Sequence, residues 1–321
     1  MRPAAWLLLL TLFALAALGF ALSSGSVDIG WDALLQIAAG NGEGMAQQLV
    51  MELRLPRALS AFATGGLLAL AGALLQVLLR NPLADPYVLG VSGGAAVAAL
   101  LAMLAGITGW GFSASALAGA LFTVALVFGL AHGRGSWSDT RLLLVGVIVA
   151  SGWGAVIAFI LAVAPEQELR GMLFWLMGDL SSAGEPLPAL LVLVAGVMLI
   201  APVARSLNVM ARGELQAAAL GVEVGRLRLV IYFGASLFTA TAVTLAGSVG
   251  FVGLVVPHLL RLLLGNDHRL LLPAAVLLGG GLLVLADTLA RTIIAPQQLP
   301  VGVLTALLGV PVFLYLLQRR Q

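Results

Sequence analysis

The sequence contains no cysteine and no lysine, and each absence excludes a class of chemistry. Without cysteine there is no disulfide, no zinc–thiolate site and no thiol catalysis. Without lysine there is no Walker A loop to hold nucleotide phosphates and no Schiff base for pyridoxal chemistry. The three histidines, His132, His258 and His268, are far apart and lack the spacing of metal ligands. We therefore expect no bound cofactor or metal, and any use of ATP requires a separate protein.

Charge is also scarce. Charged residues make up 9% of the 321 residues, against about 25% in an average soluble domain. Hydrophobic residues make up 61%, and the mean hydropathy is +1.10. Such a chain cannot cover itself with a water-facing surface, so its natural solvent is lipid.

The apolar residues fall into stretches of the length that crosses a membrane. The N-terminal stretch resembles a signal peptide, because Arg2 precedes it and Ala21-Leu22-Ser23 resembles a cleavage site. Its length and the many stretches that follow favour an uncleaved helix instead. The stretch at about 252–264 is short and contains Pro257 and His258, so it is the weakest candidate span. The pattern predicts an all-α polytopic membrane protein with about ten transmembrane helices, at roughly 4–22, 58–79, 89–107, 114–131, 142–163, 187–204, 228–246, 252–264, 271–290 and 301–317.

The placement of arginine predicts the orientation, because basic residues concentrate on the cytoplasmic side. All sixteen basic residues are arginine. With the N-terminus in the cytoplasm and about ten spans, only Arg54, Arg57, Arg170 and Arg291 lie outside. We therefore predict cytoplasmic N- and C-termini.

Residues 1–321 read as a single transmembrane domain, with no internal repeat and no soluble domain. We expect outer loops at about 23–57, with a short amphipathic helix over Trp31–Ala38, and at about 164–186. A cytoplasmic loop is expected at about 205–228, and everything else outside the spans is also expected to be loop. The 39 glycines suit close packing of helices in lipid.

The cytoplasmic loop contains a candidate docking segment. Helix-favouring residues from Glu214 to Leu220 stop at Gly221, which is a suitable residue to end a helix. One interpretation is a short helix on the membrane surface into which a partner docks. The other is a solvated connector.

The chain resembles the cobalamin, iron-siderophore and haem permease family of ATP-binding-cassette (ABC) importers, which has the type II importer fold. The likeness covers almost the whole chain and is strongest from Arg54 onward. Matching motifs follow one another in order: Arg54-Leu-Pro-Arg57; Gln76 with Arg80-Asn-Pro-Leu-Ala-Asp-Pro86; Leu89-Gly-Val-Ser-Gly-Gly94; Trp175-Leu-Met-Gly178; Gly213-Glu-Leu-Gln-Ala217 with Leu220-Gly221; Gly250-Phe-Val-Gly-Leu-Val-Val-Pro-His258; Arg261; Asp267 to Pro273; Ala286-Asp287; Arg291; Leu299-Pro-Val-Gly302; and Gly309-Val-Pro311.

The resemblance implies a coupling element at Gly213–Val222 that fits a groove on an ATPase subunit. It implies a homodimer with the pathway at its two-fold interface, two ATPase copies, and a periplasmic or lipid-anchored binding protein that delivers solute. The implied location is the bacterial inner membrane, with lipid but no nucleic acid as a partner. The implied coupling residues are Gly213, Glu214, Leu215, Gln216, Ala217, Ala218, Leu220 and Gly221.

By the same resemblance, acidic residues of the binding protein meet Arg54, Arg57 and Arg291. An alternative for Arg291 is an ion pair with Asp287, four residues earlier on one helix. The cytoplasmic gate maps to Ser138, Asp139 and Thr140, although Asp139 departs from the small hydroxyl residues expected there. We interpret His258 and Asp287, which lie in or beside apolar stretches, as structural.

Three function classes remain for comparison. The first is the permease subunit of an ATP-driven importer, which is a transport subunit and not an enzyme. The second is a secondary transporter coupled to an ion through Asp287. The third, a membrane enzyme, has no paired carboxylates, no nucleophile–histidine–acid arrangement and no metal cluster in the sequence to support it. Cobalamin, ferric siderophore and haem all suit a pathway lined by small and apolar residues.

Overall fold

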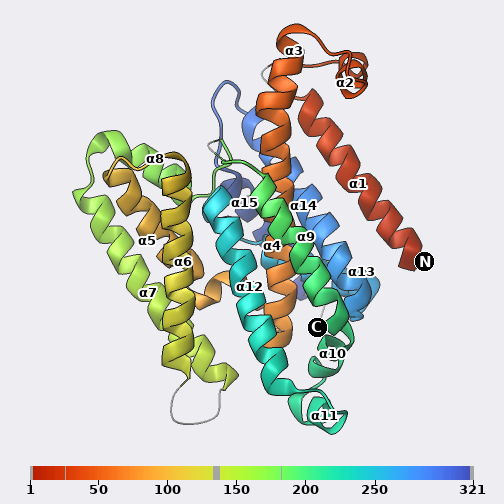
Figure 1. The fold of residues 1–321 in the computed structure, drawn as a ribbon, viewed down its shortest axis with the longest axis vertical. Helices are drawn as coiled ribbons and strands as arrows, with labels where there is room; N and C mark the ends of the chain where they lie inside the picture. Colours follow the sequence, from red (N-terminus) through yellow and green to blue (C-terminus); the bar gives the residue numbers. More distant parts are fainter. Residues whose placement is uncertain (1–2, 26, 133–137, 182, 319–321) are drawn as a thin grey trace.

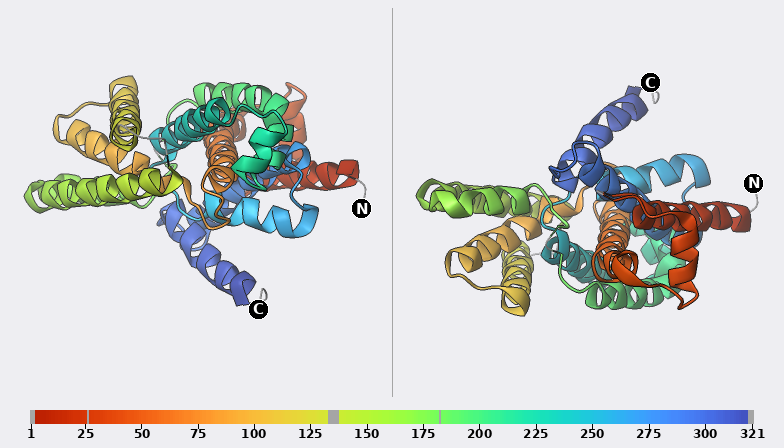
Figure 2. Two further views of the ribbon diagram at one scale, coloured as in Figure 1. Left: turned by 90° about the horizontal axis from the view of Figure 1, so that it is seen from below. Right: turned by 90° about the horizontal axis from the view of Figure 1, so that it is seen from above.

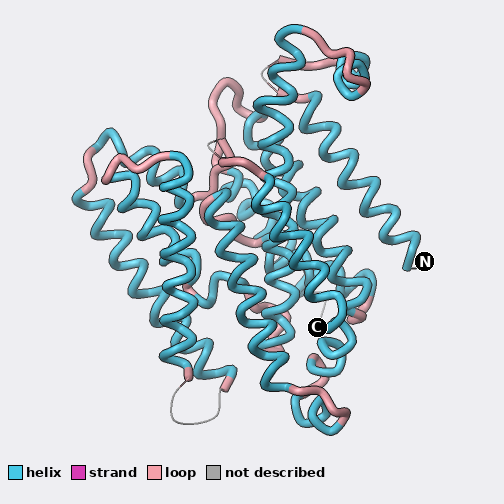
Figure 3. The backbone as a smooth tube through the Cα atoms, viewed as in Figure 1, coloured by secondary structure: helices cyan, strands magenta, loops and turns pink. Residues whose placement is uncertain are grey.

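The chain is almost entirely helical, as the computed structural model shows for residues 3–25, 27–132, 138–181 and 183–318 (Figure 3). Within these ranges the segments between helices are loops and turns, and no strand is present. The all-α fold expected from composition is thereby confirmed.

The helices follow the apolar stretches of the sequence (Figure 1). Among the described residues, seven helices are long and apolar enough to cross a membrane, and three shorter apolar helices accompany them. Every predicted apolar stretch coincides with one of these helices, while the number that span remains a prediction. In chain order the elements are α1 (Pro3–Ser23), α2 (Trp31–Ala38), α3 (Gly44–Gln48), a π-helical turn (Leu49–Arg54), α4 (Leu55–Leu78), a 3₁₀ turn (Pro86–Leu89), α5 (Val91–Leu104), α6 (Gly109–Ala131), α7 (Asp139–Val163), α8 (Glu166–Leu176), α9 (Leu187–Ile200), a 3₁₀ turn (Ala201–Val203), α10 (Ala204–Met210), α11 (Glu214–Ala219), α12 (Val224–Ala246), α13 (Val252–Leu264), α14 (His268–Thr292) and α15 (Val301–Gln318).

The helices form two groups. Helices α5, α6, α7 and α8 stand to one side, and α9, α12, α13 and α14 pack around α4 (Figure 1). The views along the bundle show α1 and α15 projecting away from the centre (Figure 2). We call the end of the bundle that carries α11 the α11 end, and the opposite end, which carries α2, α3 and α8, the α8 end (Figure 1).

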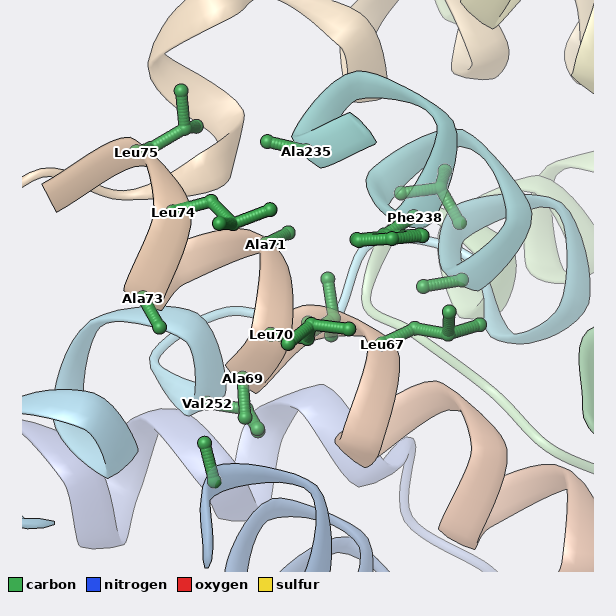
Figure 4. Close-up of a cluster of buried hydrophobic side chains, with 14 of the residues drawn as sticks. Leu67, Ala69, Leu70, Ala71, Ala73, Leu74, Leu75, Ala235, Phe238 and Val252 are labelled. Atoms are coloured by element: carbon green, nitrogen blue, oxygen red, sulfur yellow. The ribbon is translucent and has the colours of Figure 1, made fainter. Parts of the chain in front are cut away.

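Helix α4 is the centre of the fold. It packs against α14, α12, α13 and α9, and almost every residue from Ala58 to Leu78 is buried. A helix that is apolar on all sides has no face for solvent, so it belongs in an interior. Leucines and alanines of α4 meet Ala235 and Phe238 of α12 and Val252 of α13 in one continuous core (Figure 4).

Small residues bring the backbones of α4 and its neighbours into contact. A Cβ on Gly65 would lie 2.2 Å from the carbonyl oxygen of Gly279 in α14, and one on Gly72 would lie 1.8 Å from that of Gly253 in α13. Both separations are far below van der Waals contact, so any side chain would force the helices apart. These glycines therefore set the packing distance, which is the usual role of small residues between helices in lipid.

The segments expected to be loops carry more helix than predicted. The expected helix at Trp31–Ala38 is present as α2, but residues 44–54 are also helical and continue directly into α4. Pro56 has no N–H to continue the α-helical ladder, and the turn before it is π-helical. The expected loop at 164–186 contains α8, and that at 205–228 contains α10, α11 and the start of α12.

We predict that Gly72→Ala lowers the stability of the purified protein by about 1–3 kcal/mol, because the added methyl group overpacks the α4–α13 contact. Thermal unfolding of the full chain in detergent measures the change. Gly129→Ala in α6 is the matched control, since no neighbouring atom of the described residues lies within 4 Å of its Cβ position. Equal effects of the two substitutions would show that the close approach is not what the glycine provides.

Candidate functional site

The predicted coupling segment is a short helix at one extremity of the molecule (Figure 1). Gly213 precedes α11 with a φ of 136°, and Gly221 follows it with a φ of 81°. Both values are in the region that favours glycine, so the two residues allow the chain to turn into and out of the helix. The prediction of a helix that stops at Gly221 is confirmed, since α11 runs from Glu214 to Ala219.

Helix α11 is fixed to the bundle on one side. Ala217 is fully buried, and its carbonyl oxygen accepts a hydrogen bond from the Val222 N–H at 3.0 Å. The Glu214 carboxylate forms an ion pair with Arg228 of α12 and lies 3.9 Å from the guanidinium of Arg80, just beyond α4. The segment is therefore attached to both the central helix and α12.

The other side of α11 is open. Leu215 is 89% exposed and Leu220 is 72% exposed, and Gln216, Ala218 and Gly221 are exposed beside them. Large apolar side chains presented together on an anchored element are typical of a surface that a partner covers. All the predicted coupling residues lie in this one segment, on either its anchored or its open side.

The three predicted docking arginines lie in one electrostatic neighbourhood at the α8 end. Arg291 is close enough to Arg54, Arg57 and Asp287 to interact with all three charges. The group therefore has an excess of positive charge, which fits the predicted attraction of acidic residues. Each of these arginines also has an internal role.

Arg54 holds the end of α1. It is only 6% exposed, and its guanidinium donates to the carbonyl oxygens of Leu22 at 2.7 Å, Ser23 at 2.9 Å, and Val27. These are carbonyls at and beyond a helix C-terminus, which have no partner within the helix. Arg291 donates to the Ala21 carbonyl oxygen at the same place. Sequence reasoning gave no signal for these contacts, because they join segments far apart in the chain.

Arg57 forms a two-point ion pair with Asp287. Its Nε lies 2.9 Å from Oδ2 and its Nη2 2.8 Å from Oδ1, while Nη1 donates to Gln298 at 2.9 Å. The Asp287 carboxylate is buried, and a buried charge is costly unless a partner neutralises it. Arg57 is that partner. The two-point partner of Asp287 is therefore Arg57 of α4, and not Arg291, which helical spacing suggested. This pairing supports the interpretation of Asp287 as a structural residue.

The predicted gate residues lie at the start of α7. Ser138 caps this helix, its hydroxyl oxygen accepting a hydrogen bond from the Arg141 N–H at 3.1 Å. Ser138 and Thr140 are exposed, and Asp139 is the first residue of the helix. Their role as a gate stays a prediction.

Two motifs recognised in the sequence contact each other. The Tyr87 hydroxyl donates to the Val249 carbonyl oxygen and accepts from the Val249 N–H, both at 2.9 Å. The Asp85 carboxylate caps the 3₁₀ turn by accepting from the Tyr87 N–H at 2.8 Å, and burial raises the pKa of Asp85 above its usual range. The Gln76 amide reaches the Leu254 carbonyl oxygen at 3.3 Å and also accepts from Arg261. These contacts join the 80–89 segment to the residues just before α13, and α4 to the first turn of α13.

We predict that Arg57→Gln lowers stability by about 3–5 kcal/mol, because it leaves the Asp287 charge buried without its partner. The double variant Arg57→Met/Asp287→Leu is expected to recover most of this loss, since it removes both charges. Thermal unfolding of the two purified variants and the wild type measures the difference. A double variant no more stable than Arg57→Gln would contradict the pairing argument.

Comparison with known proteins places the chain among transport permeases. The model of the FecCD transport family matches residues 9–319. A Bacillus subtilis protein, the uncharacterized ABC transporter permease protein YvrB, is 42% identical over 93% of this chain and 89% of its own length. The vitamin B12 import system permease protein BtuC of Serratia proteamaculans is 40% identical, over 98% of this chain and 92% of its own.

The fold gives the same result. A solved structure of an inward-facing metal-chelate type ABC transporter superposes with a TM-score of 0.86 over 99% of both chains, at 31% sequence identity. The resemblance drawn from the sequence motifs is thus confirmed, together with the type II importer permease fold. The chain belongs to the FecCD transport family.

Proposed function

We propose that this chain is the membrane-spanning subunit of a binding-protein-dependent ABC importer that carries a bulky metal chelate across the bacterial inner membrane. The observation that carries the proposal is α11, which presents Leu215 and Leu220 to solvent while Glu214 and Ala217 fix it to the bundle. In a permease with such an element, conformational changes of a separate ATPase can be transmitted to the membrane helices. The helical spans and the import functions of the named relatives are consistent with a multi-pass inner-membrane protein.

Energy transfer in this proposal is mechanical. Movement of the ATPase displaces α11, and the ion pair between Glu214 and Arg228 passes the displacement to α12. The proximity of Glu214 to Arg80 connects the same segment to the end of α4, the central helix. The α11 end is then the cytoplasmic end, and each copy of the chain engages one ATPase copy.

A second copy of the chain completes the pathway in this proposal. Helix α7 supports it, since only 11% of its most apolar stretch is buried within a single copy. In the described part of the chain, no neighbouring atom lies within 4 Å of the Cβ positions of Gly152 and Gly154 on this helix, so another helix has room to approach closely. The proposed gate residues Ser138, Asp139 and Thr140 lie at the start of this same helix, which supports a gate close to the proposed interface.

The proposed cargo is a cobalamin, a ferric siderophore or haem. Relatives include the vitamin B12 import permease of Serratia proteamaculans and a cobalamin import permease of Halobacterium salinarum, which is 44% identical over 86% of this chain. The solved relative is described as a metal-chelate type transporter. These descriptions share one chemical class, a large chelate with a central metal ion, and they favour cobalamin within it.

The binding protein is proposed to dock at the α8 end, guided by the positive cluster of Arg54, Arg57 and Arg291. Arg170 on α8 adds an exposed guanidinium, which lies 5.5 Å from the Phe174 ring centre. Sequence reasoning placed Arg170 on the outer side without giving it this role. Exposed ion pairs contribute only about 0–1 kcal/mol each, which suits a carrier that must leave after delivery.

The alternative, a secondary transporter coupled through Asp287, is less well supported. A coupling carboxylate must bind and release an ion, and Asp287 is instead held at two points by Arg57. Uptake into liposomes separates the two functions. We expect uptake to require ATP and the ATPase subunit, whereas uptake driven by an imposed proton or sodium gradient alone would establish the alternative.

We predict that Leu215→Glu/Leu220→Glu abolishes ATP-dependent uptake while the protein remains inserted and folded. Both side chains are exposed, so charge there should disturb the ATPase contact and leave the bundle intact. Liposome uptake of cobalamin and pull-down of the ATPase subunit are the measurements. The control Leu215→Met/Leu220→Met keeps the apolar surface and should keep uptake. Full uptake by the glutamate variant would refute the coupling assignment.

We also predict that Arg170→Gln and Arg291→Gln each weaken docking of the binding protein a few-fold, since each removes one exposed or half-buried charge. The effect should be largest in low salt, where screening is least. Surface plasmon resonance on the liposome-embedded permease measures the affinity. Arg226→Gln, which removes an exposed arginine of the opposite end, should leave docking unchanged. An affinity that changes neither with salt nor with the substitution of Arg170 or Arg291 would contradict the docking proposal.

A further inference from the structure

Helix α2 has a continuous apolar face that the protein covers only in part. The apolar side chains that share this face are, in order around the helix, Ile37, Leu34, Ala38, Trp31 and Leu35. Leu34 and Ile37 are half-buried, whereas Trp31 is 61% exposed and Leu35 is 67% exposed. Large apolar side chains that share an open face are typical of a surface that a partner or a membrane covers.

The turn between α1 and α2 fixes the direction of this face. Ile29 is buried in the turn, and its N–H donates to the Ser23 carbonyl oxygen at 3.0 Å. Arg54 donates to the same Ser23 carbonyl oxygen at 2.9 Å and to the Val27 carbonyl oxygen. Because these contacts hold the turn from both sides, α2 has a defined orientation relative to α1.

Trp31 shows where the face points, because its ring lies against α1. A Cβ on Gly19 would be 3.0 Å from Cη2 of the Trp31 ring. Gly19 is four residues before Ser23, the last residue of α1, so the ring reaches about 6 Å along α1 from its end. Amphipathic helices on a membrane surface bury their apolar face about 5–10 Å deep, and tryptophan is enriched at that level.

The Trp31 ring also continues the exposed face of α1. Three leucines lie on the same side of α1 as Gly19, at helical intervals before it: Leu8, Leu12 and Leu15. Each is more than half exposed, and α1 projects away from the centre of the bundle (Figure 2). Helix α7, where a second copy is proposed to pack, lies on the opposite side of the molecule (Figures 1 and 2). Lipid is therefore the natural cover for this face of α1 and for the ring beside it.

We propose that α2 is an interfacial helix that lies in the membrane leaflet at the α8 end. Trp31 and Leu35 are buried among the lipids, and Asp32 and Gln36, on the other side of the helix, face water. The segment Trp31–Ala38 contains no basic residue, so burial of its apolar face, and not attraction to anionic lipid, holds it in the membrane.

This position of α2 has a consequence for docking. Arg54 binds the carbonyl oxygens of Leu22 and Ser23 at the end of α1, one turn from Gly19. The lipid head groups at the α8 end then lie close to the arginine cluster, and a binding protein that reaches the arginines also approaches the membrane surface. This consequence rests on the proposed function, whereas the membrane contact of α2 does not.

The chain contains no cysteine, so a single cysteine can be introduced and spin-labelled at a chosen position without further changes. Leu35→Cys and Gln36→Cys place the label on the apolar and polar faces of α2, and both native side chains are exposed. Leu12→Cys on α1 is the reference for lipid. The test uses the full-length protein in phosphatidylcholine nanodiscs, without a binding protein. Power-saturation electron paramagnetic resonance compares collisions of each label with oxygen, which concentrates in lipid, and with a water-soluble nickel chelate.

We expect the ratio of oxygen to nickel collisions to be several-fold higher at Leu35→Cys than at Gln36→Cys. It should be highest at Leu12→Cys, which lies deeper along α1. Equal ratios at the two α2 positions would overturn the proposal, because the apolar face would then be open to water. Dipolar broadening of the Leu35→Cys spectrum would also overturn it, because a second label nearby would mean that another copy of the chain covers the face.

Discussion

The rest of the structure depends on how closely α4 approaches its neighbours. In lipid there is little hydrophobic force to draw helices together, so close van der Waals contact must provide much of the attraction. The pairs Gly65–Gly279 and Gly72–Gly253 allow backbone to meet backbone along α4. Once α4 is fixed against α13 and α14, the loops at both ends of these helices also have fixed positions. Arg57 and Arg291 lie near one end of α4 and α14, and Arg80, just beyond the other end of α4, lies 3.9 Å from Glu214 of the predicted coupling segment.

Polar groups in this bundle satisfy each other across elements distant in the chain. Arg57 neutralises Asp287 across the α4–α14 contact, and Arg54 and Arg291 together hold the end of α1. Because a buried charge without a partner is costly, these pairs also fix the relative rotation of the helices. The same arginines that attract a binding protein in the proposed function thus also secure the α8 end. A binding protein that altered these contacts would act on α1, α4 and α14 together.

The α11 end follows the same logic. Glu214 attaches α11 to Arg228 of α12 and lies 3.9 Å from the guanidinium of Arg80. Gln76 accepts from Arg261, and the Asp267 carboxylate accepts from Arg269 and from the Asn208 amide. Polar contacts between separate elements therefore fix this end of the bundle as well.

The sequence by itself determined the all-helical class, the apolar stretches, the short helix at Trp31–Ala38, the short helix that stops at Gly221, and the family, because each depends on local composition or on ordered motifs. Only the tertiary structure decided that residues 44–54 extend α4, that Arg57 rather than Arg291 is the two-point partner of Asp287, and that Arg54 is buried. The partner of a charged side chain is set by which helices pack together, and spacing along one helix does not contain that information.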